Sequence, residues 1–199
     1  MPIEFTWLNF YRRVLIKKMA NLMPTPPQHV LHDQNRWWER KSACLRFTGM
    51  SIGHHVVIDE DFFVLTLCEE NLTIGAHSAI GQRFSCFAFN KVSVGKFCMF
   101  AANVTLTNGG HDKNSLIPFS GPLTIGNGCW IGNGAHICGP ISVGDNAIIS
   151  AGALVLQDVP SSAIVAGVPA KVIGYRVLPD KVWHLGNLWF SPHKFELID

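Results

Sequence analysis

The stretch from Ile125 to Val155 reads IGNGCW-IGNGAH-ICGPIS-VGDNAI-ISAGAL-V, with an apolar residue at every sixth position. A period of six fits neither an α-helix, whose period is 3.6, nor a flat strand, whose period is 2. It fits a three-sided coil in which each side is a short strand followed by a turn. The position four residues after each apolar residue is small or β-branched, as a narrow interior requires. These positions are Cys129, Ala135, Ile141, Ala147, Ala153 and Val159.

The same frame continues upstream, with interruptions. Sets of three apolar positions begin at residues 52, 74, 94, 125 and 143, which are 22, 20, 31 and 18 residues apart. Compared with an 18-residue coil, the largest surplus is 13 residues, between Leu106 and Ile125. Gly often follows the apolar residue, where limited space or a positive φ would favour it. Because stacked coils bury one continuous apolar column, we predict a parallel β-helix over residues 51–165, with an inserted loop at 107–123.

The two ends of the chain depart from this period. Apolar residues at helical spacing over residues 5–22 predict a short amphipathic helix, which a Pro-rich stretch then ends. Residues 181–186 predict one or two helical turns with a Gly stop. An uncapped solenoid exposes strand edges and apolar surface. We therefore expect residues 1–50 to form a helical and irregular N-terminal cap and residues 166–199 to form a C-terminal cap.

The composition excludes several classes of protein. A chain of 199 residues that is 48% hydrophobic suits one compact domain. The formal net charge of +2 gives no field that would attract nucleic acid. Because neither a membrane-spanning apolar run nor a signal-peptide pattern is present, we expect a cytoplasmic protein whose six cysteines stay reduced. A peripheral membrane contact through residues 5–22 is left open.

The inserted loop contains the sequence Asn108-Gly109-Gly110-His111-Asp112. Long excursions from a rigid scaffold are common places for functional side chains. An imidazole can accept a proton near neutral pH, so His111 is a candidate general base. On the residues alone, however, a loop histidine is more often an ordinary surface residue than a catalytic one.

Three motifs surround this loop: NVTLTNGGH at residues 103–111, LTIGNGCWIG at residues 123–132 and AGVPAKVI at residues 166–173. Together they resemble the hexapeptide-repeat acyltransferases, which include maltose, galactoside and virginiamycin acetyltransferases and polysaccharide O-acetyltransferases. The resemblance covers residues 50–175. It implies an all-β fold, a left-handed parallel β-helix, with a short N-terminal helical segment and a C-terminal cap. It also implies a homotrimer with active sites between subunits and acetyl-CoA as the donor.

The resemblance also assigns roles to single residues. His111 matches the family's catalytic base, which takes a proton from the acceptor as that acceptor attacks the thioester. Trp130 matches a residue of the CoA cleft, and backbone amides near Asn133 and Ala151, one coil apart, would bind the pantetheine arm. No metal is required, because a thioester is already activated and direct transfer needs positioning, a base and oxyanion donors.

The sequence departs from many of these relatives at one position. They carry Lys where Gln157 stands, directly before Asp158-Val159-Pro160. A partner for a CoA phosphate is therefore missing there, and Lys171 or Arg176 is the candidate replacement.

The predicted function is acetyl-CoA-dependent O-acetylation of a sugar or polysaccharide hydroxyl. The loop offers only Asp112 as an acid that could serve an amine, which favours a hydroxyl acceptor. N-acetylation of an amino sugar stays open as the alternative. A γ-type carbonic anhydrase would need a second histidine close to His111 in its loop, and a non-catalytic scaffold would not need the His111 loop at all.

Overall fold

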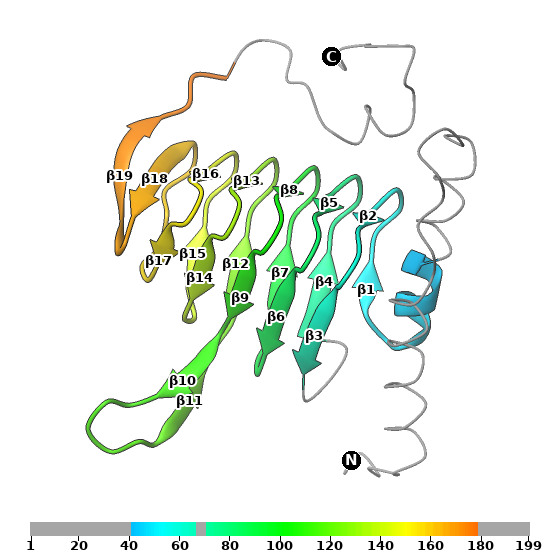
Figure 1. The fold of residues 1–199 in the computed structure, drawn as a ribbon, viewed down its shortest axis with the longest axis horizontal. Coiled ribbons are helices and arrows are strands. Elements are labelled where there is room, and N and C mark those ends of the chain that lie inside the picture. The colour runs from blue at the N-terminus through cyan, green and yellow to red at the C-terminus, as the bar shows by residue number, and fades with distance from the viewer. Residues whose placement is uncertain (1–40, 67–70, 179–199) are drawn as a thin grey trace.

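The computed structural model describes residues 41–66 and 71–178 of the chain. The predicted helix of residues 5–22, with its possible membrane contact, and the predicted turns at 181–186 lie outside the described residues. The described part is a stack of three-sided coils from which one hairpin projects (Figure 1).

Three parallel sheets form the sides of the prism. Sheet A contains β1 (Ser51–Ile52), β4 (Leu72–Ile74), β7 (Val92–Val94), β12 (Leu123–Ile125) and β15 (Ser142–Val143). Sheet B contains β2 (Val57–Ile58), β5 (Ala79–Ile80), β8 (Met99–Phe100), β13 (Trp130–Ile131), β16 (Ile148–Ile149) and β18 (Ala163–Gly167). Sheet C contains β3 (Phe63–Thr66), β6 (Ser85–Ala88), β9 (Thr105–Thr107), β14 (His136–Cys138) and β17 (Leu154–Val155).

The register between coils confirms the predicted repeat. On sheet A the paired inward residues are those that begin the predicted sets: Ile52, Ile74, Val94, Ile125 and Val143. These side chains and their counterparts on sheets B and C are buried in one apolar cluster. The residues in excess of 18 per coil therefore protrude from the prism between coils and do not disturb the stack of inward apolar side chains.

Limited space, and not a positive φ, accounts for the glycine that follows the apolar residue. A Cβ added at Gly132 would lie 2.5 Å from the backbone nitrogen of Ala151 in the next coil, a contact that real Cβ atoms do not make. The left-handed backbone occurs two residues later in the turn, at Gly134 (φ 67°) and, one coil earlier, at Asn103 (φ 60°). Close stacking of coils at the corners is thus what requires Gly at this position.

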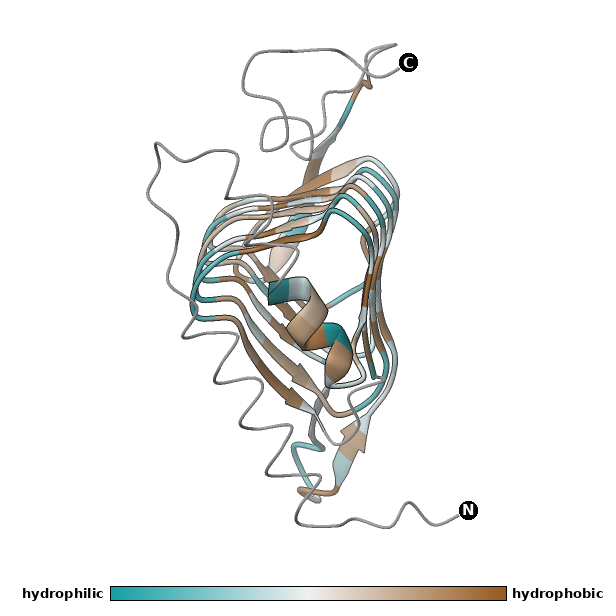
Figure 2. Ribbon diagram, turned by 90° about the vertical axis from the view of Figure 1, so that its right-hand side faces the viewer, coloured by the Kyte–Doolittle hydropathy of each residue, from teal (hydrophilic) through white to brown (hydrophobic). Residues whose placement is uncertain are grey.

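The N-terminal end of the prism is closed by a helical segment at residues 41–47, which lies across the three-sided outline in Figure 2. Gly49 (φ 102°) ends this helix. Within the described residues no coil precedes the first one to bond its outer carbonyls, and side chains of the helix bond them instead. The donors are Lys41, Ser42 and Arg46, and the acceptors are the carbonyl oxygens of Ile52, Gly53, Val56 and Asp59.

At the other end, β18 continues sheet B to Gly167, two residues beyond the predicted limit of the β-helix. The chain then reverses into β19 (Ala170–Tyr175), which pairs antiparallel with β18. The described part of the C-terminal cap is therefore a strand that covers the last edge of sheet B.

Candidate active site

The inserted loop is a β-hairpin, formed by β10 (Gly109–His111) and β11 (Pro118–Ser120). In their antiparallel register, Gly109 faces Ser120 and His111 faces Pro118. The hairpin leaves the prism at the edge where sheet C passes into sheet A, and it extends away from the coils (Figure 1). His111 is exposed, and no other described side chain hydrogen-bonds its imidazole.

Asn108 fixes the base of the hairpin and is fully buried. Its Oδ1 accepts hydrogen bonds from the backbone N–H groups of Phe89 (2.9 Å) and Asn90 (3.2 Å), and its Nδ2 donates to the Lys91 carbonyl (3.2 Å). The Gly121 N–H, at the end of the hairpin, donates to the Asn108 carbonyl (3.1 Å). Asn108 was not among the residues predicted from the sequence. The available signal was a polar side chain in an inward-facing slot directly before Gly109-Gly110-His111.

Asp112 organises the tip of the hairpin. Its Oδ1 accepts hydrogen bonds from the Asn114 N–H (3.0 Å) and from both the N–H and the hydroxyl of Ser115 (2.8 Å each). These bonds, those from Ser115 first, lower the pKa of the Asp112 carboxyl from its ordinary value because they stabilise the ionised form. The carboxylate and the Ser115 hydroxyl are thus used within the turn.

The predicted CoA residues gather along a different edge of the prism. Asn133 and Ala151 lie in the turns that lead from sheet B to sheet C in successive coils, and both are exposed. They are stacked, since the Gly152 N–H donates to the Asn133 carbonyl at 2.8 Å. Trp130 stands on the outer face of sheet B in the same coil as Asn133, with 46% of its surface exposed. The structure thus stacks Asn133 and Ala151 at this edge and places Trp130 on the adjoining face of sheet B.

The two predicted phosphate partners are placed differently. Lys171 is exposed on β19, opposite Ala166 of β18. The Arg176 guanidinium donates to the carbonyl oxygens of Gly128 and Asn146, at 3.3 Å each. Those carbonyls belong to turns between sheets A and B, so Arg176 ties the end of β19 to an edge that carries neither Asn133 nor Ala151. Both phosphate roles stay predictions.

His111 and the CoA residues lie at opposite edges of sheet C. The hairpin emerges after β9, where sheet C ends, whereas Asn133 and Ala151 come before β14 and β17, where sheet C begins. Within one copy of the chain the two groups are therefore separated by the width of that sheet.

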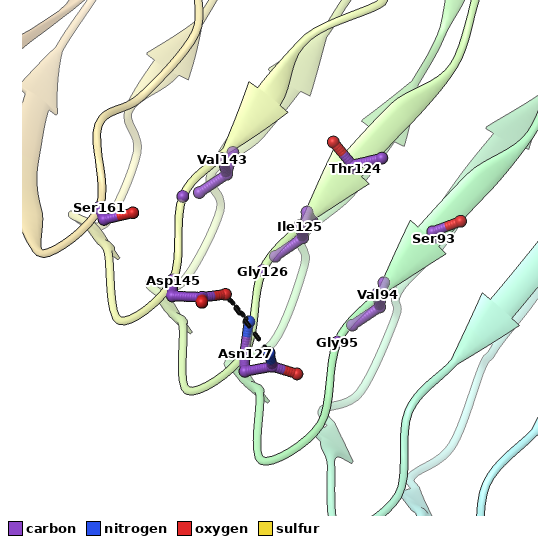
Figure 3. A pocket seen from close by; sticks show the side chains of 11 residues that line it. Ser93, Val94, Gly95, Thr124, Ile125, Gly126, Asn127, Val143, Asp145 and Ser161 are labelled. Atoms are coloured by element: carbon purple, nitrogen blue, oxygen red, sulfur yellow. Dashed lines mark hydrogen bonds between the residues drawn. The ribbon is translucent and has the colours of Figure 1, made fainter.

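A groove of about 430 Å³ runs along the edge between sheets A and B (Figure 3). Its lining includes Gly95, Gly126 and Gly144, where close stacking of coils leaves no room for a Cβ, but none of the predicted site residues. The Asp145 carboxylate in this groove accepts a hydrogen bond from the Asn127 N–H at 2.6 Å. The Asp145 carboxylate would repel a CoA phosphate, so we do not place the CoA site in this groove.

The described residues contain no group of three or more His, Cys, Asp and Glu side chains that could hold a metal ion. The five cysteines in this part of the chain are free, and Cys129, directly before β13, is buried. Burial raises the pKa of the Cys86 thiol to about 12.

Between residues 41 and 178, leaving out 67–70, no helix is long and apolar enough to cross a bilayer.

Comparison with known proteins gives a consistent result. Residues 122–157 match the family model described as bacterial transferase hexapeptide (six repeats). The chain is 38% identical over 171 residues to galactoside O-acetyltransferase of Escherichia coli (strain K12), covering 79% of this chain and 77% of that protein.

Two solved structures have the same fold. A galactoside acetyltransferase in complex with coenzyme A matches with a TM-score of 0.70 and 24% identity, covering 87% of this chain and 84% of that one. A maltose O-acetyltransferase from Clostridium difficile 630 matches with a TM-score of 0.67 and 25% identity, covering 85% and 89%. The predicted left-handed parallel β-helix is confirmed by this likeness and by the family match.

Proposed function

The chain belongs to the hexapeptide-repeat acetyltransferases, and on this premise we propose that it moves an acetyl group from acetyl-CoA to a hydroxyl of a saccharide, with His111 as general base. That it is an acyltransferase follows from the family. The observation that supports the finer proposal most strongly is the exposed His111 on a rigidly anchored hairpin, within a chain so similar to a galactoside O-acetyltransferase.

The proposed chemistry is direct transfer. The acceptor oxygen attacks the thioester carbonyl carbon as His111 takes the hydroxyl proton. The tetrahedral intermediate then collapses, the C–S bond breaks, and the proton passes from the imidazolium to the leaving CoA sulfur. A hydroxyl loses its proton only as it attacks, so a neutral imidazole is a fitting partner. Neither Cys129, which is buried, nor Ser115, whose hydroxyl bonds Asp112, is needed as a nucleophile.

The proposed site is completed by a second copy of the chain. In a ring of three copies, the hairpin edge of one copy meets the Trp130, Asn133 and Ala151 edge of the next, and sheet C of each copy faces the common axis. Contacts of this head-to-tail kind close into a ring when the rotation between copies is a third of a turn. Separation of the two groups of residues within one chain supports this assembly.

A hydroxyl acceptor is preferred to an amine. The Asp112 carboxylate, the acid nearest His111 in the hairpin, accepts three hydrogen bonds within the turn. It is therefore poorly placed to hold an ammonium group. The names of the matching relatives, galactoside and maltose O-acetyltransferase, point in the same direction.

The test is thiol release from acetyl-CoA with matched pairs of sugars that differ only by a hydroxyl or an amino group at one carbon. We expect faster release with the hydroxyl sugar and a product that alkali hydrolyses, as an ester requires. A preference for the amino sugar with an alkali-stable amide product would replace O-acetylation by N-acetylation and leave the acetyl-CoA chemistry standing.

A further inference from the structure

Three stacked aromatic rings form a column at the corner between sheets A and B, the edge that Figure 3 shows further along the stack. The ring column consists of His55, His77 and Phe97, which take the same left-handed place in the turns of the first three coils (φ 53°, 59° and 57°). The His55 and His77 ring centroids lie 5.1 Å apart with the planes at 25°. Those of His77 and Phe97 lie 5.0 Å apart with the planes at 7°, so the His77 ring lies between two others.

Backbone hydrogen bonds join the same turns. The His77 N–H donates to the His54 carbonyl, and the Phe97 N–H donates to the Ala76 carbonyl, at 3.0 Å each. The ring column and these hydrogen bonds therefore connect the same pairs of coils. Repulsion between neighbouring rings would act against the hydrogen bonds that hold those coils together.

Every charged side chain in the turns before and after His77 is a base. The turn before it contains His54 and His55, and the turn after it contains Lys96. Cys98, the other titratable residue of that later turn, is buried inside the prism. Burial first, and then the charges of His55, His54 and Lys96, lower the pKa of His77 from its ordinary value.

Protonation of His77 would place a cation between an imidazole and a phenyl ring. The Phe97 ring would attract that cation, but this one contact opposes the loss of hydration and the repulsion from three neighbouring bases. Because its pKa is lowered, His77 binds a proton less well in the folded chain than in the unfolded one. Its contribution to stability is therefore complete above the ordinary histidine pKa of about 6.5 and is lost as the pH falls below that value.

We propose that the ring column is an acid-sensitive joint, which releases the first two coils and the helical cap from the rest of the prism when its histidines are protonated. The cap belongs to the same unit, because the Arg46 guanidinium donates to the Gly53 carbonyl at 2.8 Å, directly before His54. The inference goes beyond the proposed function and does not depend on it, since neither His111 nor the predicted CoA residues lie in the first two coils.

Thermal unfolding of the full chain, followed by circular dichroism between about pH 7.5 and about pH 5.5, tests the joint. His77→Phe keeps three stacked rings and removes the central proton site, so its melting temperature should fall about 2–4 °C less than that of wild type over this range. Phe97→His puts a third imidazole into the column and should make the fall steeper than in wild type. His111→Ala, which removes an exposed histidine outside the column, should follow wild type.

Hydrogen exchange measured by mass spectrometry locates the opening. After correction for the intrinsic effect of pH on exchange, amides of β2 and β5 should lose protection at about pH 5.5 in wild type and keep it in His77→Phe. Amides of β16 and β17 should stay protected in both.

Equal falls in melting temperature for wild type and His77→Phe, or a loss of protection spread over all coils, would overturn the proposal. Should His77→Phe fail to fold, Phe97→His decides the question. A fall no steeper than that of wild type in Phe97→His would also contradict the joint.

Discussion

The outer faces of sheets A and B differ in chemical character, although both sheets belong to the same coils. Both direct a column of large apolar side chains into the prism, yet their outward residues differ in kind. On sheet A they are Ser51, Thr73, Ser93, Thr124 and Ser142. On sheet B they are Val57, Ala79, Met99, Trp130, Ile148 and Ile164.

The apolar side chains that point into the prism determine that the chain folds as a coil. The side chains that point outward determine what each face contacts. Hydroxyl side chains suit a face that stays in water, and an apolar face needs a ligand or a partner. Sheet C is also apolar in part, since Phe63 and Leu65 on β3 are each about half exposed, as is Leu156 directly after β17. The two apolar faces meet at the edge that carries Asn133 and Ala151, and the hairpin leaves from the far edge of sheet C. Function is therefore expected on sheets B and C and not on sheet A.

The largest expected effect is at the hairpin. His111→Ala should reduce kcat by about 10²–10⁴-fold, the usual contribution of a general base. The melting temperature should stay within 1 °C or so, about the scatter expected of exposed surface changes, because His111 is exposed and packs in no coil. Thr124→Ala on sheet A is the matched control and should keep wild-type turnover. Activity of His111→Ala within threefold or so of wild type would remove the base from the mechanism.

A charge on sheet C should dissociate the proposed trimer, whereas a charge on sheet A should not. Leu154 is half-buried on the outer face of β17, and Leu154→Glu would place a carboxylate in the proposed contact between copies, where desolvation penalises it. Ser142→Glu makes the same charge change on sheet A. Light scattering should give a monomer for the first variant and a trimer for the second, and dissociation by Ser142→Glu instead would assign the interface to sheet A.

The smallest expected effect concerns the donor. Trp130 and Thr124 hold outward positions on successive strands of one coil, so they compare the two faces directly. Trp130→Ala should raise the KM for acetyl-CoA about tenfold, as the loss of one stacked ring would, and leave kcat nearly unchanged. Thr124→Ala should change neither parameter. A similar rise in KM for both variants would contradict the assignment of CoA to the sheet B side.

The six-residue period made the fold predictable down to register. The predicted starts of the five sets, from Ile52 to Val143, are paired residues in sheet A. The hydrogen bonds of Arg176 and the role of Asn108 could not be predicted from the sequence, because they depend on tertiary contacts that a periodic pattern does not encode. Arg176 bonds carbonyls 48 and 30 residues away, and Asn108 is a polar residue in an inward slot. The insertion was recognised as a surplus, but its hairpin depends on the Asn108 anchor and the Asp112 turn.

If His111 of one copy works with the CoA edge of another, mixing subunits of two inactive variants should restore activity. His111→Ala lacks the base but keeps the CoA edge, while Ala151→Trp should block the CoA edge and keep the base. Each variant alone should release almost no thiol from acetyl-CoA. After the two are unfolded and refolded together in equal amounts, random assembly gives about a quarter of the sites both intact halves. We expect the mixture to recover about a quarter of wild-type activity. A mixture no more active than its parents would show that each site lies within a single copy.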